Sequence, residues 1–353
     1  MSRDLPPLRF AAVGIDHRHS YDQVASLLDV GAHCVGFWTE GTPKTLDGFI
    51  KRFPQIPRVD DRARLIEDPS IQLITCAAIP SDRAAHAVEA MRLGKDFMAD
   101  KPGVTTFSQL DEVMRVQRET GRIYSVNFTE RFEVRAVTRA LELVGAGAIG
   151  DVVQTVGLGP HRLNRALRDP WFFDRSKYGG ILADIASHQI DQFLAFTGAD
   201  DAQIVLARAG NVAHPDDPGL EDFGEIVLAH GHASAYIRVD WFTPDGLPTW
   251  GDGRLFITGT RGSIELRKYV DIAGRPGIDH LFLVDGTGVR HIDCSDAKLP
   301  YYENLRRDIA ERTQTAMSQA HCFKVCELAL KAQAAALPVG RAATAAGRSS
   351  GRA

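Results

Sequence analysis

Residues 8–15 read LRFAAVGI, a short apolar run with a glycine at its end. Such a run is typical of a strand buried on both faces of a parallel sheet. Similar runs follow at 33–38 (HCVGFW), 71–79 (IQLITCAAI) and 96–99 (DFMA), with helical stretches at 20–30, 81–93 and 106–120. Strands that alternate with helices indicate a parallel sheet covered by helices on both faces. We therefore predict an α/β first domain over residues 1–125.

The pattern changes after residue 125. A helix is predicted at 132–145 and a second at 181–197, among strands at 151–158, 203–212, 222–229, 233–242, 254–259, 262–268 and 280–286. Turn signals between several strands predict an α+β domain over 126–302, built on a large, mostly antiparallel open sheet. Helices over 303–337 are expected to pack back onto the first domain, and the small, polar tail 338–353 is expected to be disordered.

The composition limits the classes of function. The 353 residues suit two domains, and a formal net charge of −4 argues against nucleic acid as a partner. No apolar run reaches the roughly 20 residues of a membrane-spanning helix, and Met1–Pro7 lacks the apolar core of a signal peptide. We expect a cytoplasmic protein with a small-molecule substrate.

The five cysteines are odd in number and scattered. Cys34 and Cys76 lie inside strand-like runs, where a buried thiol is the simple interpretation. Cys322 and Cys326 are four residues apart beside His321, and packing is favoured there over a metal site. Reduced thiols are therefore expected, in line with a cytoplasmic location.

Asp100-Lys101-Pro102 follows directly after the strand at 96–99. A lysine at the carboxyl end of a parallel strand points into the crevice where α/β proteins bind ligands. Proline fixes the backbone behind it. A solvated surface lysine is the alternative interpretation.

Residues 179–191 read GGILADIASHQID. In the predicted helix, Asp184 and His188 are at positions i and i+4 and so share a face. The paired glycines Gly179 and Gly180 would leave the N–H groups of the helix N-terminus open to a ligand. Asp191 could bond the other ring nitrogen of His188 and fix its tautomer. Because the neighbouring residues are apolar, function is favoured over a solvated face.

The two motifs together resemble the glucose–fructose oxidoreductase/inositol dehydrogenase family over roughly residues 8–335. That family has a Glu-Lys-Pro motif, here Asp100-Lys101-Pro102, and a Gly-Gly-Gly-x-x-x-Asp-x-x-x-His helix, here Gly179 to His188. The resemblance implies a Rossmann domain followed by an open antiparallel-sheet domain whose outer face often builds dimers. It also implies a nicotinamide cofactor, a sugar, cyclitol or polyol substrate, and a homodimer or homotetramer.

Hydride transfer requires a base for the hydroxyl proton and a group that stabilises the developing alkoxide. His188 suits the proton transfer because its unperturbed pKa is about 6.5. Lys101 supplies the positive charge, and Asp184 is expected to bind a neighbouring hydroxyl. The resemblance further implies a substrate contact from Arg131. His161 and Trp171 are also expected at the substrate, together with Asp184 and His188, because aromatic faces suit the apolar C–H faces of sugar rings; core packing or a dimer interface is the alternative for the aromatic residues.

The dinucleotide fingerprint departs from the usual G-x-G-x-x-G. The sequence after the first strand is Gly14-Ile15-Asp16-His17-Arg18-His19, and only the first glycine is kept. Glu40, next to Thr39 after the second strand, is placed to bind the ribose, which favours NAD without excluding NADP. The residues expected to contact the cofactor are Gly14, Asp16, His17, Arg18, Glu40, Pro80, Asp100 and Lys101.

Two alternatives stay open. His17 and His19 could join His161 around a metal ion, although packing of the loop is favoured and no metal is predicted. The chain could also be a redox-neutral enzyme with retained NAD, a lyase, epimerase or glycoside-cleaving enzyme, or a non-catalytic dinucleotide or sugar sensor. The leading interpretation is an NAD(P)-dependent dehydrogenase that acts on CH–OH groups.

Overall fold

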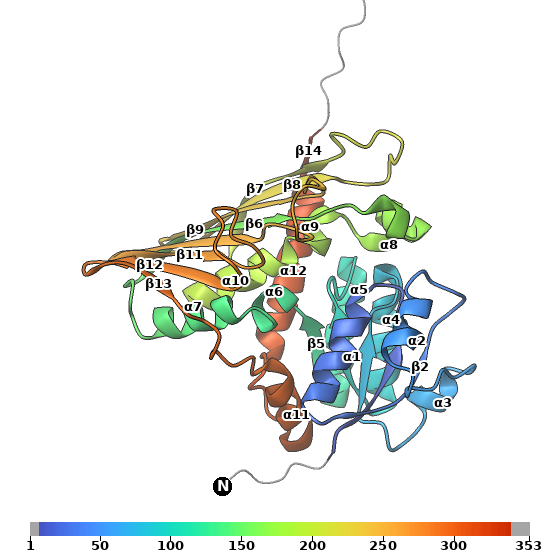
Figure 1. Ribbon diagram of the computed structural model, residues 1–353. Helices are drawn as coiled ribbons and strands as arrows, with labels where there is room; N and C mark the ends of the chain where they lie inside the picture. The colour runs from blue at the N-terminus through green and yellow to red at the C-terminus, as the bar shows by residue number, and fades with distance from the viewer. Residues whose placement is uncertain (1–6, 340–353) are drawn as a thin grey trace, which may run out of the picture.

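The computed structural model describes residues 7–339 and places two sheets side by side (Figure 1). Within these residues, five parallel strands form the first sheet in the order β2-β1-β3-β4-β5. The strands are β1 (Arg9–Val13), β2 (His33–Trp38), β3 (Leu73–Cys76), β4 (Asp96–Asp100) and β5 (Tyr124–Asn127). The helices around them are α1 (His19–Asp29), α2 (Leu46–Arg52), α3 (Ala63–Ile66), α4 (Pro80–Arg92) and α5 (Phe107–Thr120). The predicted parallel α/β architecture is confirmed.

Two details of the first sheet differ from the expected strands. The short segment around Val59, which lies between α2 and α3, makes only one parallel bridge, from Phe37 to Arg58, and forms no strand. Strand β5 was not predicted, because Ser125 and Asn127 interrupt its apolar pattern. Tyrosine hydroxyls lie 2.7 Å from Ser125 Oγ and 2.8 Å from Asn127 Nδ2, so both buried side chains have a partner for at least one polar atom.

The second sheet is mostly antiparallel, as predicted. Among the described residues it has nine strands in the order β13-β12-β11-β10-β6-β9-β8-β7-β14, with parallel pairing only at β6–β9 and β7–β14. The strands are β6 (Val152–Pro160), β7 (Gln203–Gly210), β8 (Phe223–His230), β9 (Ala233–Asp240), β10 (Arg254–Gly259), β11 (Gly262–Arg267), β12 (His280–Asp285), β13 (Gly288–Ile292) and β14 (Leu337–Pro338). β13 and β14 were not predicted.

Helices lie on one face of this sheet (Figure 1). They are α6 (Thr129–Phe132), α7 (Arg135–Gly145), α8 (Arg175–Tyr178), α9 (Ile181–Asp184) and α10 (Ser187–Thr197), with 3₁₀ turns at Arg165–Leu167 and Pro170–Phe173. α10 packs on β6 and β9, and α7 packs on β11 and β12. This arrangement leaves the other face of the sheet without a covering helix.

The C-terminal helices are α11 (Tyr301–Glu311) and α12 (Gln319–Ala335). α12 packs against both domains (Figure 1). Its Gln319 accepts a hydrogen bond from the Tyr124 N–H of β5, whereas its Gln333 accepts one from the Leu182 N–H of α9. α12 therefore holds the lysine-bearing sheet and the aspartate-bearing helix in a fixed relation.

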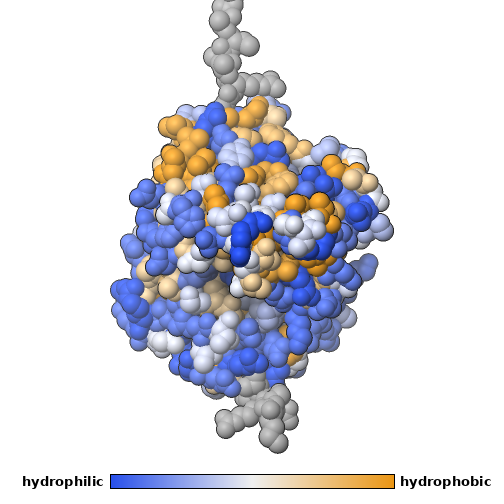
Figure 2. Space-filling view, turned by 90° about the vertical axis from the view of Figure 1, so that its left-hand side faces the viewer, coloured by the Kyte–Doolittle hydropathy of each residue, from blue (hydrophilic) through white to orange (hydrophobic). Residues whose placement is uncertain are grey.

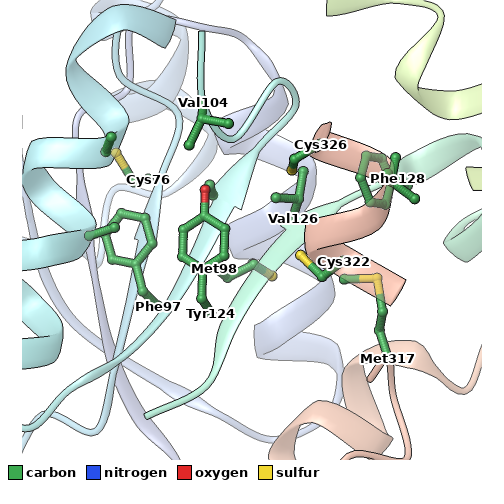
Figure 3. Packing of buried hydrophobic residues seen from close by; sticks show 14 of the residues in the cluster. Cys76, Phe97, Met98, Val104, Tyr124, Val126, Phe128, Met317, Cys322 and Cys326 are labelled. Carbon is green, nitrogen blue, oxygen red and sulfur yellow. The ribbon is translucent and has the colours of Figure 1, made fainter. Parts of the chain in front are cut away.

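Cys322 and Cys326 of α12 face β5 (Figure 3). Both are buried and free, and Val126 and Tyr124 lie beside them. The packing interpretation of these thiols is confirmed.

The expected disordered tail differs at its start. Leu337 and Pro338 pair with β7, so the chain stays ordered through these positions. Residues 340–353, the rest of that expectation, lie outside the described residues. No helix between residues 7 and 339 is both long and apolar enough to cross a bilayer.

Candidate active site

Lys101 is the first residue after β4, and its side chain reaches the second domain. Its Nζ donates to Oδ1 of Asp184 over 2.7 Å, and both side chains are at most one-tenth exposed. A buried ammonium group requires such a partner because removing the charge from water is costly. The structure thus joins two of the predicted catalytic residues directly.

Asp184 has a different contact from the expected one. We predicted that it binds a substrate hydroxyl, but its carboxylate accepts from Lys101 and it is not among the residues that line the cavity described below. Its role in this structure is to hold Lys101 in position.

His188 is almost fully buried, and its ring lines the same cavity as Lys101. Its Nδ1 has no hydrogen-bond partner among residues 7–339. Burial, reinforced by the positive charge of Lys101, holds the pKa of His188 well below its ordinary value. The imidazole is therefore neutral near pH 7 and able to accept a proton.

The helix that carries Asp184 and His188 is interrupted. We predicted one helix over 181–197, but α9 ends at Asp184 and α10 begins at Ser187. At the break, the His188 N–H bonds to the carbonyl of Ile185, three residues back. The prediction that Asp184 and His188 share one face of an unbroken helix is therefore wrong. Asp184 still contacts Lys101, and His188 lines the same cavity as Lys101.

The open helix N-terminus expected after Gly179 and Gly180 is also absent from the described structure. The Ile181 N–H donates to Glu221, and the Leu182 N–H donates to Gln333. These side chains come from distant parts of the chain and cap the helix. The glycines instead allow close packing, since a Cβ on Gly180 would lie 2.3 Å from the Gln333 side chain.

Asp191 and Arg131 bind each other and not the expected partners. Asp191 was predicted to orient His188, and Arg131 to contact substrate. The Arg131 guanidinium instead donates to both carboxylate oxygens of Asp191 over 2.6 and 2.7 Å, and His321 lies 2.7 Å from the same carboxylate. The expected bond from Asp191 to His188 is therefore wrong. Arg131 does not line the cavity, and its contact with substrate stays a prediction.

The loop after β1 is shaped by Gly14. Its φ is +79°, and a Cβ there would lie 2.4 Å from the Cβ of Ala78. The Gly14 carbonyl accepts from the Ala77 N–H, and the His17 N–H returns a bond to the Ala77 carbonyl. The first glycine of the fingerprint therefore keeps its function of letting two backbones approach closely.

His17 and His19 both turn toward Asp100. His17 Nδ1 lies 3.1 Å from Asp100 Oδ2, and His19 Nδ1 lies 2.9 Å from Oδ1. His161 lines the cavity, but its Nδ1 is 3.0 Å from the Gly159 carbonyl and it is not part of this group. The metal alternative based on His161 therefore has the wrong third ligand.

Arg83 was missed from the sequence. Its buried guanidinium donates to the carbonyls of Asp100, Lys101 and Pro102 and to the Asp100 carboxylate. It thereby fixes the turn that carries Lys101. No signal in the sequence points to it, because it is one of two arginines, with Arg92, in an otherwise ordinary helix.

The cavity between the two domains has a volume of about 230 Å³. It is lined by both predicted and unpredicted residues: His17, Arg18, His19, Asp22, Lys101, Thr129, Glu130, Glu133, Val134, His161, Arg162, Asn164, Arg168, His188, Trp241, Trp250 and Tyr269. Two tryptophan faces and several polar side chains suit a small polyhydroxylated molecule. Trp171, expected at the substrate, lies outside this lining, near the His17 ring.

Glu130 and Lys268 form a second buried pair behind the cavity. Lys268 Nζ donates to Glu130 Oε2, which also accepts from Gln189 Nε2 over 2.9 Å. The other oxygen, Oε1, has no partner in the described part of the chain. Because Glu130 lines the cavity, it is a candidate acceptor for a substrate hydroxyl.

The remaining predicted cofactor residues surround the loop. Burial raises the pKa of Asp16 from 3.8 to about 6, which weakens its repulsion of phosphate. Arg18 is the residue before α1 and supplies a cation that can attract an anion, whereas the N–H groups of His19, Ser20 and Tyr21 already bond within the loop. Glu40 is exposed after β2, and Pro80 begins α4.

The structure brings an arginine, Arg58, close to the loop of Glu40. Arg58 donates to the carbonyl of Gly41 over 2.8 Å. A cation beside this loop weakens the sequence argument for NAD over NADP.

Residues 164–172 of the second domain lie over the loop after β1 and are bonded to Lys44, which follows β2. Lys44 bonds the carbonyls of Ala166 and Arg168 over 3.0 and 2.8 Å, and its N–H bonds Asp169. The hollow left between the segment and the loop measures about 50 Å³, too small for a dinucleotide. Asp16, His17 and Arg18, which border this hollow, are among the residues predicted to contact the cofactor.

Two sequence models of one family match the chain. Residues 8–128 match the oxidoreductase family with an NAD-binding Rossmann fold, and residues 137–265 match the GFO/IDH/MocA C-terminal domain. The crystal structure of a protein from Erwinia carotovora atroseptica SCRI1043, described as an oxidoreductase without a stated substrate, is 46% identical. It covers 94% of this chain and 99% of its own, with a TM-score of 0.91.

More distant relatives have named activities. A scyllo-inositol 2-dehydrogenase (NADP(+)) of Bacillus subtilis is 24% identical over 57% of this chain and 55% of its own length. Levoglucosan dehydrogenase of Pseudarthrobacter phenanthrenivorans is 27% identical over 43% of this chain and 40% of its own. The chain thus spans about half the length of these curated relatives. A structure of a levoglucosan dehydrogenase with NADH and levoglucosan shares the fold at a TM-score of 0.76 and 19% identity, over 93% and 96% of the two chains.

Proposed function

Because the chain belongs to the GFO/IDH/MocA family of NAD-binding oxidoreductases, we propose that it oxidises a hydroxyl-bearing carbon of a sugar, cyclitol or related polyol. The observation that carries the proposal is the pairing of Lys101 with Asp184 beside the neutral, unpartnered ring of His188. These groups meet the requirements of alcohol oxidation, a fixed positive charge and a proton acceptor.

His188 and Lys101 have separate roles in this proposal. The imidazole of His188, whose ring lines the cavity, accepts the proton of the reacting hydroxyl group. Lys101 Nζ, held by Asp184, stabilises the negative charge that grows on the substrate oxygen. Asp184 is thus a positioning residue, and Arg83 positions Lys101 from the backbone side.

NAD, when bound, accepts the hydride from the substrate carbon. Gly14, Asp16, His17 and Arg18 would hold it along the loop after β1, and Glu40 and Pro80 would flank its adenosine half. The carboxyl ends of β1, β3 and β4 meet where the strand order reverses, which is the usual ligand crevice of such sheets. Asp100 and Lys101 lie at this edge.

The test measures cofactor and substrate separately. Binding of NAD(H) and NADP(H) to the purified chain is followed by calorimetry, and absorbance of the reduced nicotinamide is followed with a panel of inositols, aldoses and sugar acids. We expect micromolar dinucleotide binding and oxidation of at least one polyol. Absence of dinucleotide binding would overturn the proposal, as would NAD that stays bound through purification without net oxidation of any polyol.

We also propose that the chain forms a homodimer or homotetramer in the cytoplasm. The second sheet carries exposed apolar side chains, among them Val153, Val205, Val284 and Val289. Apolar residues gather at the height of this sheet on the side shown in Figure 2. The five cysteines, all within the described residues, are unpaired, which suits a reducing compartment. A monomeric mass in light scattering at micromolar concentration would contradict the assembly.

A further inference from the structure

His17, His19 and Asp100 form a compact group to which the proposed dehydrogenase mechanism gives no role in proton or hydride transfer, although His17 and Asp100 are also placed near the cofactor. One ligand atom from each lies within 4.8 Å of the others. Asp100 is fully buried, whereas the two histidine side chains are 12% and 24% exposed and line the cavity. The group therefore has a closed side formed by the carboxylate and an open side toward the cavity.

The atoms are of the kind that transition metals prefer. Zn²⁺ binds imidazole nitrogen and carboxylate oxygen at about 2.0–2.2 Å, which places neighbouring ligand atoms of a tetrahedral site roughly 3.3 Å apart. His17 Nδ1 lies 3.1 Å from Asp100 Oδ2 and His19 Nδ1 lies 2.9 Å from Asp100 Oδ1, so each ring faces one oxygen of the same carboxylate. One ligand atom from each of the three residues lies within the 4.8 Å that a shared ion can span after a small adjustment.

The carboxylate is also oriented from behind. Asp100 Oδ1 accepts from the Lys101 N–H over 2.8 Å, and Oδ2 lies 3.2 Å from the Arg83 guanidinium. Such outer bonds are what fix ligand groups in metal sites.

We propose that His17, His19 and Asp100 bind one divalent transition-metal ion, with Zn²⁺ the best match to this ligand set. Three protein ligands leave a fourth position open, and that position faces the cavity of Lys101 and His188. An oxygen of the bound small molecule would occupy it, and the ion would polarise that oxygen as a Lewis acid. The ion would thus reinforce the charge of Lys101 at the substrate.

The test is metal binding to the full chain without cofactor. After chelator treatment and dialysis, Zn²⁺ and Co²⁺ are titrated by calorimetry, and Co²⁺ is followed by its visible absorption. We expect one ion per chain. His19→Asn should weaken Zn²⁺ binding at least about tenfold and abolish the Co²⁺ absorption. Its side chain is partly exposed, so the variant is expected to fold even if Asp100→Asn does not.

The matched control is His161→Asn, which removes a histidine from the same cavity that is not part of the group. Its metal affinity should stay within about threefold of the parent. No stoichiometric binding to the parent, or equal affinity of the His19 variant and the parent, would overturn the proposal. Because these measurements need no dinucleotide, failure here is distinguishable from failure of the proposed dehydrogenase activity.

Discussion

The cavity receives polar side chains from two regions that satisfy them in different ways. In the first domain, Asp100 is surrounded by His17, His19 and Arg83, and both its oxygens are bonded within the protein. In the second domain, His188 is equally buried but leaves its Nδ1 without a partner among the described residues. Buried polar atoms are usually hydrogen-bonded. The second region is therefore the one in which a bound molecule can supply a missing hydrogen-bond partner.

The Lys101–Asp184 pair connects these regions, so breaking it has the largest expected effect. Lys101→Ala removes the positive charge from the cavity and leaves a buried carboxylate unpaired. We expect kcat/KM for the best polyol to fall about 10³-fold, within the range of lost electrostatic stabilisation. NADH affinity should change less than about threefold. Steady-state kinetics and NADH fluorescence check both values.

Lys51→Ala is the control for Lys101→Ala, because Lys51 is an exposed lysine of the first domain on α2. It should leave both quantities unchanged. Turnover of Lys101→Ala within tenfold of the parent would refute the assigned role of the lysine.

The loop region depends on backbone shape, and Gly14→Ala tests that dependence. The new Cβ would sit in a left-handed conformation and overlap Ala78 at 2.4 Å. We expect a loss of about 2–5 kcal/mol in the free energy of unfolding, from backbone strain plus overpacking. Gly41→Ala has the same kind of φ, +61°, with no neighbour within 4 Å, and should lose only about 1–2 kcal/mol. Equal losses in urea denaturation would show that the approach of Ala78 is unimportant.

The region around His188, whose Nδ1 has no partner among the described residues, is tested by His188→Gln. Glutamine fills similar space but does not accept the substrate proton, so we expect kcat to fall about 10²-fold. The parent's fall in rate toward low pH, caused by protonation of His188, should disappear in the variant. His86→Gln, a half-buried histidine on α4 away from the cavity, serves as the control. An unchanged pH profile would show that another group takes the proton.

The sequence predicted the first region's framework better than its contacts. Buried strands such as β3 coincide with local apolar runs, so their positions can be predicted from the local sequence alone. The meeting of His19 with Asp100 depends on residues 81 positions apart. The two residues meet because β4 lies next to β3 in the sheet and α1 begins at the carboxyl end of β1. A local sequence pattern cannot predict this arrangement.

In the second region the motif was found but its geometry was not. The positions of Asp184 and His188 were identified by spacing, yet the helix between them breaks. The N–H groups at the start of α9 are capped by Glu221, which lies just before β8, and by Gln333 of α12. Side chains from distant segments decide such capping, so an unbroken helix was the natural but incorrect expectation.

The smallest expected effect concerns Asp16, the charged residue in the loop's second glycine position. Burial raises its pKa from 3.8 to about 6, so the unfolded chain ionises before the folded one as pH rises. The wild-type protein therefore loses stability between pH 4 and 6, whereas Asp16→Asn does not. Relative to wild type, the variant should gain about 1–3 kcal/mol from pH 4 to 7 and nothing further above it. Urea midpoints at pH 4.5 and 7.5 measure this gain, with exposed Asp29→Asn as the control. A pH-independent difference would mean that the Asp16 carboxylate is solvated, and the loop would then carry a full negative charge where a dinucleotide phosphate is expected to bind.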